Sequence, residues 1–116
     1  MNIETLTNIC RALPFVAEDV KWGNDLCFTI GAKMFCAIPL EGPLNVSFKV
    51  TDEEFGELST SFGIIPAPYA ARHKWILVEE CNIFNQQQWE HYINKSYNLV
   101  KMKLPKKVLR DMGKSE

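Results

Sequence analysis

The stretch LCFTIGAKMFCAIPL, residues 26–40, is the strongest indicator of fold in this chain. Its first run, 26–30, is rich in strand-forming residues, and a second apolar run, 33–40, follows the dipeptide Gly31-Ala32. A two-residue connection with glycine first is typical of a β-hairpin. The stretch therefore predicts two adjacent antiparallel strands.

Further strands are predicted on both sides of this hairpin. Residues 18–22 precede it as a short strand, and residues 74–79 contain another apolar run. Over residues 44–50, apolar and polar residues alternate, which predicts a half-buried strand with one solvated face. Residues 64–71 contain two prolines, and we expect an ordered loop without regular structure there.

The helices are predicted from apolar spacing and from capping residues. Residues 3–13 place apolar side chains on one helical face. Thr51 and Glu54 form a capping-box pattern, which predicts a short helix that begins there. A long helix is expected over residues 86–104, and one further turn over residues 106–112.

The order of the elements predicts the fold class. A helix, a meander of strands, a helix, a strand and a helix follow one another, and hairpin connections dominate. This order indicates an α+β fold with a mainly antiparallel sheet of about five strands and helices packed on one face. We expect a single domain spanning residues 1–116.

The composition supports an ordinary folded domain. The chain has 116 residues, of which 47% are hydrophobic and 23% are charged, and this balance argues against disorder. No apolar run approaches the roughly 18 residues of a membrane span, so we expect no membrane contact and a cytoplasmic location.

The four cysteines do not follow a metal-binding pattern. Cys10, Cys27, Cys36 and Cys81 form no Cys-x-x-Cys pair, and none has a histidine at ligand spacing. They are predicted to be small buried hydrophobic residues in a reducing compartment, with no bound metal.

Charge is distributed unevenly along the chain. Residues 95–116 hold seven basic and two acidic residues, whereas residues 1–94 hold six basic and twelve acidic residues. A polyanionic partner would therefore bind the basic C-terminal part. The alternative is that these lysines only solvate the end of a helix.

Sequence signatures of catalysis are missing. The chain has no Gly-x-Ser-x-Gly nucleophile elbow and no glycine-rich phosphate-binding loop. His73 lies between two cations that favour its neutral form, so it is the one candidate for acid–base chemistry. The prediction is a protein that is not an enzyme and has no cofactor.

Two segments provide candidates for binding an anion. One runs from Tyr69 to Trp75 and contains Arg72, His73 and Lys74. The other, near the C-terminus, contributes the remaining cations: Lys101, Lys103, Lys106, Lys107 and Arg110. Such side chains can pair with phosphates, and an exposed aromatic ring can stack on a base.

An ordered set of motifs also resembles a known family. The set includes Leu13-Pro14, Lys21-Trp22-Gly23, Phe28…Gly31-x-Lys33, Ser47-Phe48-Lys49, Pro66-Ala67-Pro68-Tyr69, Ser96-Tyr97-x-Leu99-Val100 and Leu104-Pro105-Lys106-Lys107. It resembles the MmcQ/YjbR family of small bacterial proteins over nearly the whole chain. The resemblance implies a CyaY-like (frataxin-like) fold and DNA binding by a double-wing type of motif. The matching basic positions are Lys33, Lys49, Arg72, Lys74, Lys106 and Lys107.

Two functions follow from these observations. The first is weak, salt-dependent binding of DNA by a monomer, through phosphate contacts and without clear readout of bases. The alternative is a module that binds a protein or a small ligand. It would use a pocket near Trp22, Tyr69, His73 and Trp75.

Overall fold

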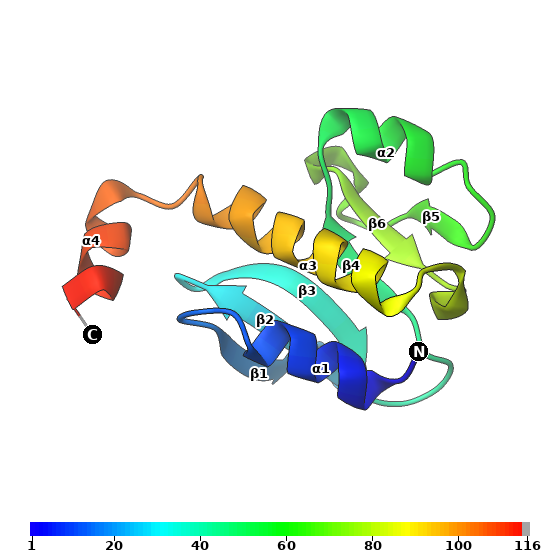
Figure 1. Cartoon of the computed structure of the whole chain (residues 1–116), viewed down its shortest axis with the longest axis horizontal. Helices are drawn as coiled ribbons and strands as arrows, with labels where there is room; N and C mark the ends of the chain where they lie inside the picture. The colour runs from blue at the N-terminus through cyan, green and yellow to red at the C-terminus, as the bar shows by residue number, and fades with distance from the viewer. Residues whose placement is uncertain (115–116) are drawn as a thin grey trace.

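A computed structural model describes residues 1–114 of the chain (Figure 1). Within these residues, one antiparallel sheet has the strand order β1-β2-β3-β4-β6-β5. The strands are β1 (Ala17–Lys21), β2 (Asp25–Ile30), β3 (Lys33–Pro39), β4 (Val46–Lys49), β5 (Ile64–Pro66) and β6 (Trp75–Val78). The α-helices are α1 (Ile3–Arg11), α2 (Asp52–Leu58), α3 (Gln86–Lys101) and α4 (Lys106–Lys114), and the short 3-10 helices are η1 (Ala71–His73) and η2 (Cys81–Ile83).

The α+β fold with an antiparallel sheet is confirmed, but the sheet has six strands rather than about five. The additional strand is β5, in the segment that was predicted to be a loop. Ile64 pairs with Val78, and Pro66 pairs with Ile76. Because β5 is an edge strand, Pro66 needs no backbone N–H on the open side, and proline is tolerated there.

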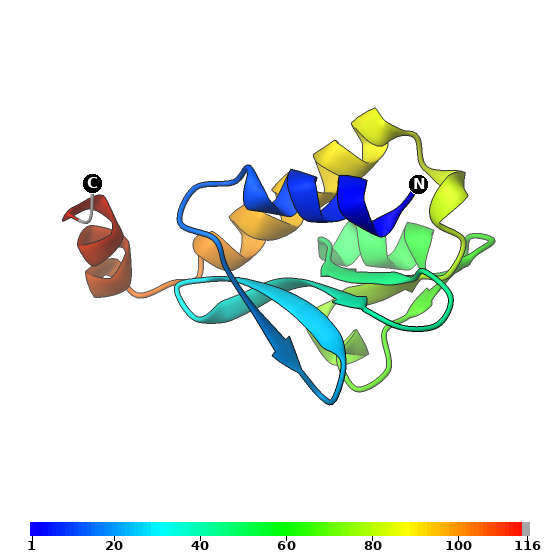
Figure 2. The ribbon, with the colours of Figure 1, turned by 90° about the horizontal axis from the view of Figure 1, so that it is seen from below.

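The helices cover one face of the sheet. Figure 2 shows α1 and α3 side by side on one side of the strands, with α4 set apart at the far end. Trp89 of α3 and Phe48 of β4 are fully buried, and their rings meet edge to face at 5.9 Å. The Trp89 indole donates a hydrogen bond to the Cys81 carbonyl at 2.9 Å, so its polar group is satisfied inside the core. All four cysteines are buried thiols, as predicted.

The turn between β2 and β3 fixes the position of α4. Gly31 and Ala32 both have positive φ, as in the tight turns that match the twist of paired strands. A Cβ at Gly31 would lie 2.8 Å from Leu104 and 3.0 Å from Val108, so the bare backbone allows both side chains to pack on the turn. α3 ends at Lys101, three residues earlier than predicted, and a full helix follows where one turn was expected.

A side chain of α3 joins the two central strands where their pairing stops. The β3–β4 ladder contains only two residue pairs, and the last of them is Cys36 with Phe48. Beyond it, the buried Ser96 hydroxyl accepts a hydrogen bond from the Lys49 N–H at 3.0 Å and donates one to the Phe35 carbonyl at 2.6 Å. Ser96 therefore links β3 and β4 where their direct pairing ends, and it fixes the backbone position of Lys49.

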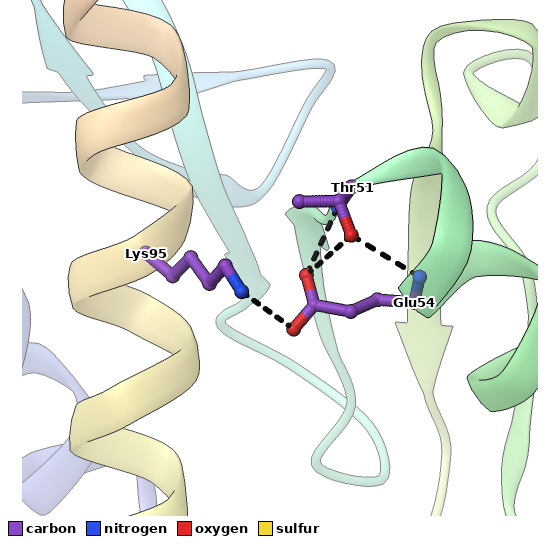
Figure 3. Close-up of polar contacts among 3 residues, drawn as sticks. All are labelled: Thr51, Glu54 and Lys95. Carbon is purple, nitrogen blue, oxygen red and sulfur yellow. Dashed lines mark hydrogen bonds and ion pairs between the residues drawn. The ribbon is translucent and has the colours of Figure 1, made fainter.

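α2 is tied to α3 through its own capping box, which Figure 3 shows. The Thr51 hydroxyl accepts a hydrogen bond from the Glu54 N–H at 3.1 Å, and the Glu54 carboxylate accepts one from the Thr51 N–H at 3.0 Å. The Lys95 ammonium lies 3.2 Å from the other Glu54 oxygen. Burial alone would raise the pKa of Glu54, but the hydrogen bonds from Thr51 and Lys95 outweigh it, so the pKa is lowered.

Candidate nucleic-acid interface

Basic residues from separate elements meet at one end of the sheet. The register places the end of β4 beside the start of β6, because Lys49 pairs with Trp75. The β2–β3 turn lies at the same end, because Ile30 pairs with Lys33 there. We call this the basic end; its candidate cations are Lys33, Lys49, Arg72, Lys74, Lys101, Lys103, Lys106, Lys107 and Arg110.

A surface hollow of about 280 Å³ lies between these elements. Three lysines, Lys33, Lys49 and Lys103, line it together with His73. Its apolar lining comes from Met34, Val100 and Leu104. These three lysines come from β3, β4 and the turn after α3, although they lie 16 to 70 residues apart in the chain.

Lys49 is the most constrained of the three. Burial lowers its pKa, and the nearby charges of Lys103 and Lys74 lower it further, with only Asp52 acting in the opposite direction. Its ammonium donates a hydrogen bond to the His73 carbonyl. A bound anion would relieve the repulsion between these cations, so the site favours negatively charged ligands.

The residues before β6 form the second part of the basic end. Arg72 donates a hydrogen bond from Nε to His73 Nε2 at 3.3 Å, so the two side chains lie together on the surface. The Lys74 ammonium sits over the ring of Phe55 in α2, 5.1 Å from its centroid. Lys74 is therefore turned toward α2 and lies beside the hollow rather than in it.

The C-terminal cations extend the basic end away from the sheet. The Lys101 ammonium sits over the Tyr97 ring at 5.8 Å, on a part of α3 that faces the residues after α1, because Tyr97 donates a hydrogen bond to the Pro14 carbonyl. Three other cations lie on the exposed side of α4, beyond Leu104: Lys106, Lys107 and Arg110. The predicted basic positions thus share one end of the molecule, but only Lys33, Lys49 and Lys103 line the hollow.

The pocket proposed as an alternative is not assembled. Trp22 follows β1, whose pairing of Lys21 with Asp25 places it at the other end of the sheet. Three strands separate β1 from β6, so these two strands lie about 19 Å apart at the usual strand spacing. Trp75 is buried and Tyr69 is fully exposed. Of the four predicted residues, only His73 lines the hollow.

The opposite end of the sheet carries mainly acidic residues. Asp25 begins β2, Glu41 follows β3 by two residues, and Glu79 with Glu80 follow β6. Lys21 is the basic residue that ends β1 there. We call this the acidic end; at the basic end, the acidic residues Asp52, Glu53 and Glu54 follow β4 in the first turn of α2.

Sequence reasoning missed the residue that positions Lys49. In the sequence, Ser96 stands out only as part of the motif Ser96-Tyr97-x-Leu99-Val100, which gives it no role of its own. A serine among buried apolar positions is the available signal, because a buried hydroxyl requires hydrogen-bond partners. The sequence does not indicate which strands provide them.

The profile of the YjbR family matches residues 11–99. The chain belongs to the YjbR family. Among solved structures, it is similar to protein DR2400 of Deinococcus radiodurans, which contains a DUF419 domain. That likeness has a TM-score of 0.85 at 23% identity, and it covers 97% of this chain and 88% of the other.

A second similar structure is a Pseudomonas syringae protein, with a TM-score of 0.70 and 20% identity over 86% of this chain and 99% of the other. At these identities, the two likenesses establish the YjbR fold and leave the ligand open. No curated protein matches the chain. The CyaY-like relationship and the double-wing motif stay predictions.

Among residues 1–114, no helix combines the length and the apolar character that crossing a membrane requires.

Proposed function

We propose that this YjbR protein binds DNA through its basic end, by phosphate contacts and without readout of bases. The observation that carries the proposal is the convergence of Lys33, Lys49 and Lys103 on one hollow. Further cations on both sides of the hollow extend the same surface. Neutralisation of several phosphates releases their counterions, which is the main source of non-specific affinity for DNA.

The kind of cation supports phosphate contacts rather than base recognition. Seven of the nine candidate residues are lysines. A lysine ammonium is a point charge on a flexible stem, which suits a phosphate, whereas base recognition favours the planar fork of arginine. The proposed role is therefore positional and electrostatic.

The proposal also covers the location and the oligomeric state of the protein. We place it in the bacterial cytoplasm as a monomer that binds without catalysing a reaction. Four buried, unpaired cysteines fit a reducing compartment. The similar structures come from two bacteria.

A titration of a labelled 20-base-pair duplex, followed by fluorescence anisotropy at 50 and 200 mM salt, tests the proposal. Four phosphate contacts would weaken binding by about a hundredfold between these conditions. Lys103→Glu is expected to reduce the affinity at 50 mM salt by about tenfold and to flatten the salt dependence.

Lys21→Glu is the matched control, because Lys21 is an equally exposed lysine at the acidic end. Its binding should stay within twofold of the wild type. No binding at 50 mM salt, or equal losses for the two variants, would overturn the proposal.

A further inference from the structure

Tyr69 is an exposed aromatic ring whose position no packing explains. Its side chain is fully exposed, and its φ of 65° lies in the left-handed region. That conformation is uncommon for a bulky residue and is energetically unfavourable. Strain of this kind persists where the surrounding structure holds it, and it is concentrated at sites that contact a ligand.

The loop around Tyr69 is held firmly by its own backbone. The Ala67 N–H donates to the Trp75 carbonyl at 3.0 Å, and the Ala70 N–H donates to the Ala67 carbonyl at 3.2 Å. Trp75 and Ala67 are both buried. The ring is therefore presented from a fixed base, so a ligand that stacks on it would have little backbone to order.

Tyr69 lies in the segment that leads to the cationic hollow. It precedes His73, which lines the hollow, by four residues. Four residues span at most about 14 Å, and the bend through η1 shortens that distance. Stacked nucleotides advance by about 3.4 Å each and unpaired ones can extend further, so about four nucleotides span the distance from His73 to Tyr69.

We propose that the basic end takes an unpaired stretch of nucleic acid, with phosphates at Lys33, Lys49 and Lys103 and one base stacked on Tyr69. This inference rests on the proposed function and specifies its substrate. Bases inside a duplex are covered on both faces by their neighbours, whereas an unpaired base can stack on an aromatic side chain. Stacking accepts any base, so it agrees with a site that does not read sequence.

The test compares four labelled oligomers at 50 mM salt by fluorescence anisotropy. They are a mixed-sequence DNA dodecamer, its duplex, an abasic DNA dodecamer that keeps the phosphates without bases, and an RNA dodecamer of the same sequence. We expect the single-stranded DNA or RNA dodecamer to bind at least fivefold more tightly than both the duplex and the abasic chain.

Tyr69→Ala should reduce the affinity for the better-bound single strand by about tenfold and leave duplex and abasic binding within twofold. Tyr69→Phe keeps the ring and should bind like the wild type. Trp22→Ala removes the exposed ring at the acidic end and should change nothing. Thermal unfolding of each variant confirms that the fold is intact.

The outcomes separate this inference from the proposed function. If the duplex and the abasic chain bind but Tyr69→Ala loses no affinity for either single strand, the unpaired-base proposal is overturned and phosphate binding stands. If none of the four oligomers binds, both fail. A selective loss with Tyr69→Ala supports the proposal, and the better-bound of the DNA and RNA strands identifies the source of the unpaired bases.

Discussion

Trp22 and Tyr69 are alike in backbone and exposure but differ in the charges around them. Both have left-handed φ values, 51° and 65°, and Trp22 is 70% exposed whereas Tyr69 is fully exposed. Trp22 shares its end of the sheet with Asp25 and Glu41, whereas Tyr69 lies near the lysine-lined hollow. Backbone strain and exposure thus do not distinguish these two rings, and the surrounding charge does.

The two ends also differ in how their strands are joined. At the acidic end, β2 and β3 pair regularly from Asp25 with Pro39 to Phe28 with Cys36, and their register shifts between Phe28 and Thr29, nearer the basic end. At the basic end, the β3–β4 ladder stops, and the Ser96 hydroxyl bridges the separated strands. The link between β3 and β4 at the basic end therefore depends on a single side chain from α3.

The largest effect is expected from Ser96→Ala. The Lys49 N–H and the Phe35 carbonyl would both lose a buried partner, which should lower the free energy of unfolding by about 2–3 kcal/mol. Urea unfolding measures the loss, and amide hydrogen exchange should accelerate at Lys49 while β1 and β2 stay protected.

Thr7→Ala is the control for this variant. Thr7 is also buried, but its hydroxyl bonds only to the Glu4 carbonyl within α1. Thr7→Ala should therefore lower the free energy of unfolding by much less than Ser96→Ala does. Equal losses, or uniform acceleration of exchange, would show that Ser96 does not hold the basic end in particular.

The two glycine turns give the next comparison. Gly31 at the basic end and Gly23 at the acidic end both have positive φ, so alanine introduces backbone strain of about 1 kcal/mol at each. Only at Gly31 would the new methyl group also contact Leu104 and Val108. Gly31→Ala should therefore lower the unfolding free energy by about 1 kcal/mol more than Gly23→Ala, as measured by urea unfolding. Equal losses would mean that α4 does not pack on the turn as described.

The smallest change in unfolding free energy is expected when a glutamate is replaced by glutamine, at the partly buried Glu54 or at the exposed Glu18. The pKa of Glu54 is lowered, so the folded state binds fewer protons than the unfolded state in the acidic range. Its contribution to stability is present above the ordinary glutamate pKa and is lost as pH falls through the lowered value. Glu54→Gln should cost about 0.5 kcal/mol at pH 7 and nothing below the lowered pKa.

Glu18→Gln provides the exposed comparison. The hydrogen bond from Arg11 lowers the pKa of Glu18, but both side chains of this pair lie largely in solvent. Water screens such a pair, so the urea midpoint should not change at pH 7 or at pH 3. A larger loss of stability for Glu18→Gln than for Glu54→Gln would contradict the expectation that the partly buried glutamate contributes more.

Much of the fold could be predicted because its signals are local. The hairpin turn at Gly31, the capping box of Thr51 and Glu54, and the alternation over 44–50 each act within a few residues. β5 was missed because its proline pattern also describes a loop, and only pairing with β6 makes it a strand. Most phosphate-binding candidates were found by residue type in two basic segments, whereas Lys33 and Lys49 came from the family resemblance.

The sequence by itself determined most of the secondary-structure elements, the α+β class and the excess of positive charge near the C-terminus, because each depends on neighbouring residues. The tertiary structure alone decided that Lys33, Lys49 and Lys103 share a hollow, and that Trp22 lies at the opposite end from Tyr69. The physical reason is strand order and register. A shift of one residue would turn every side chain of a strand to its other face.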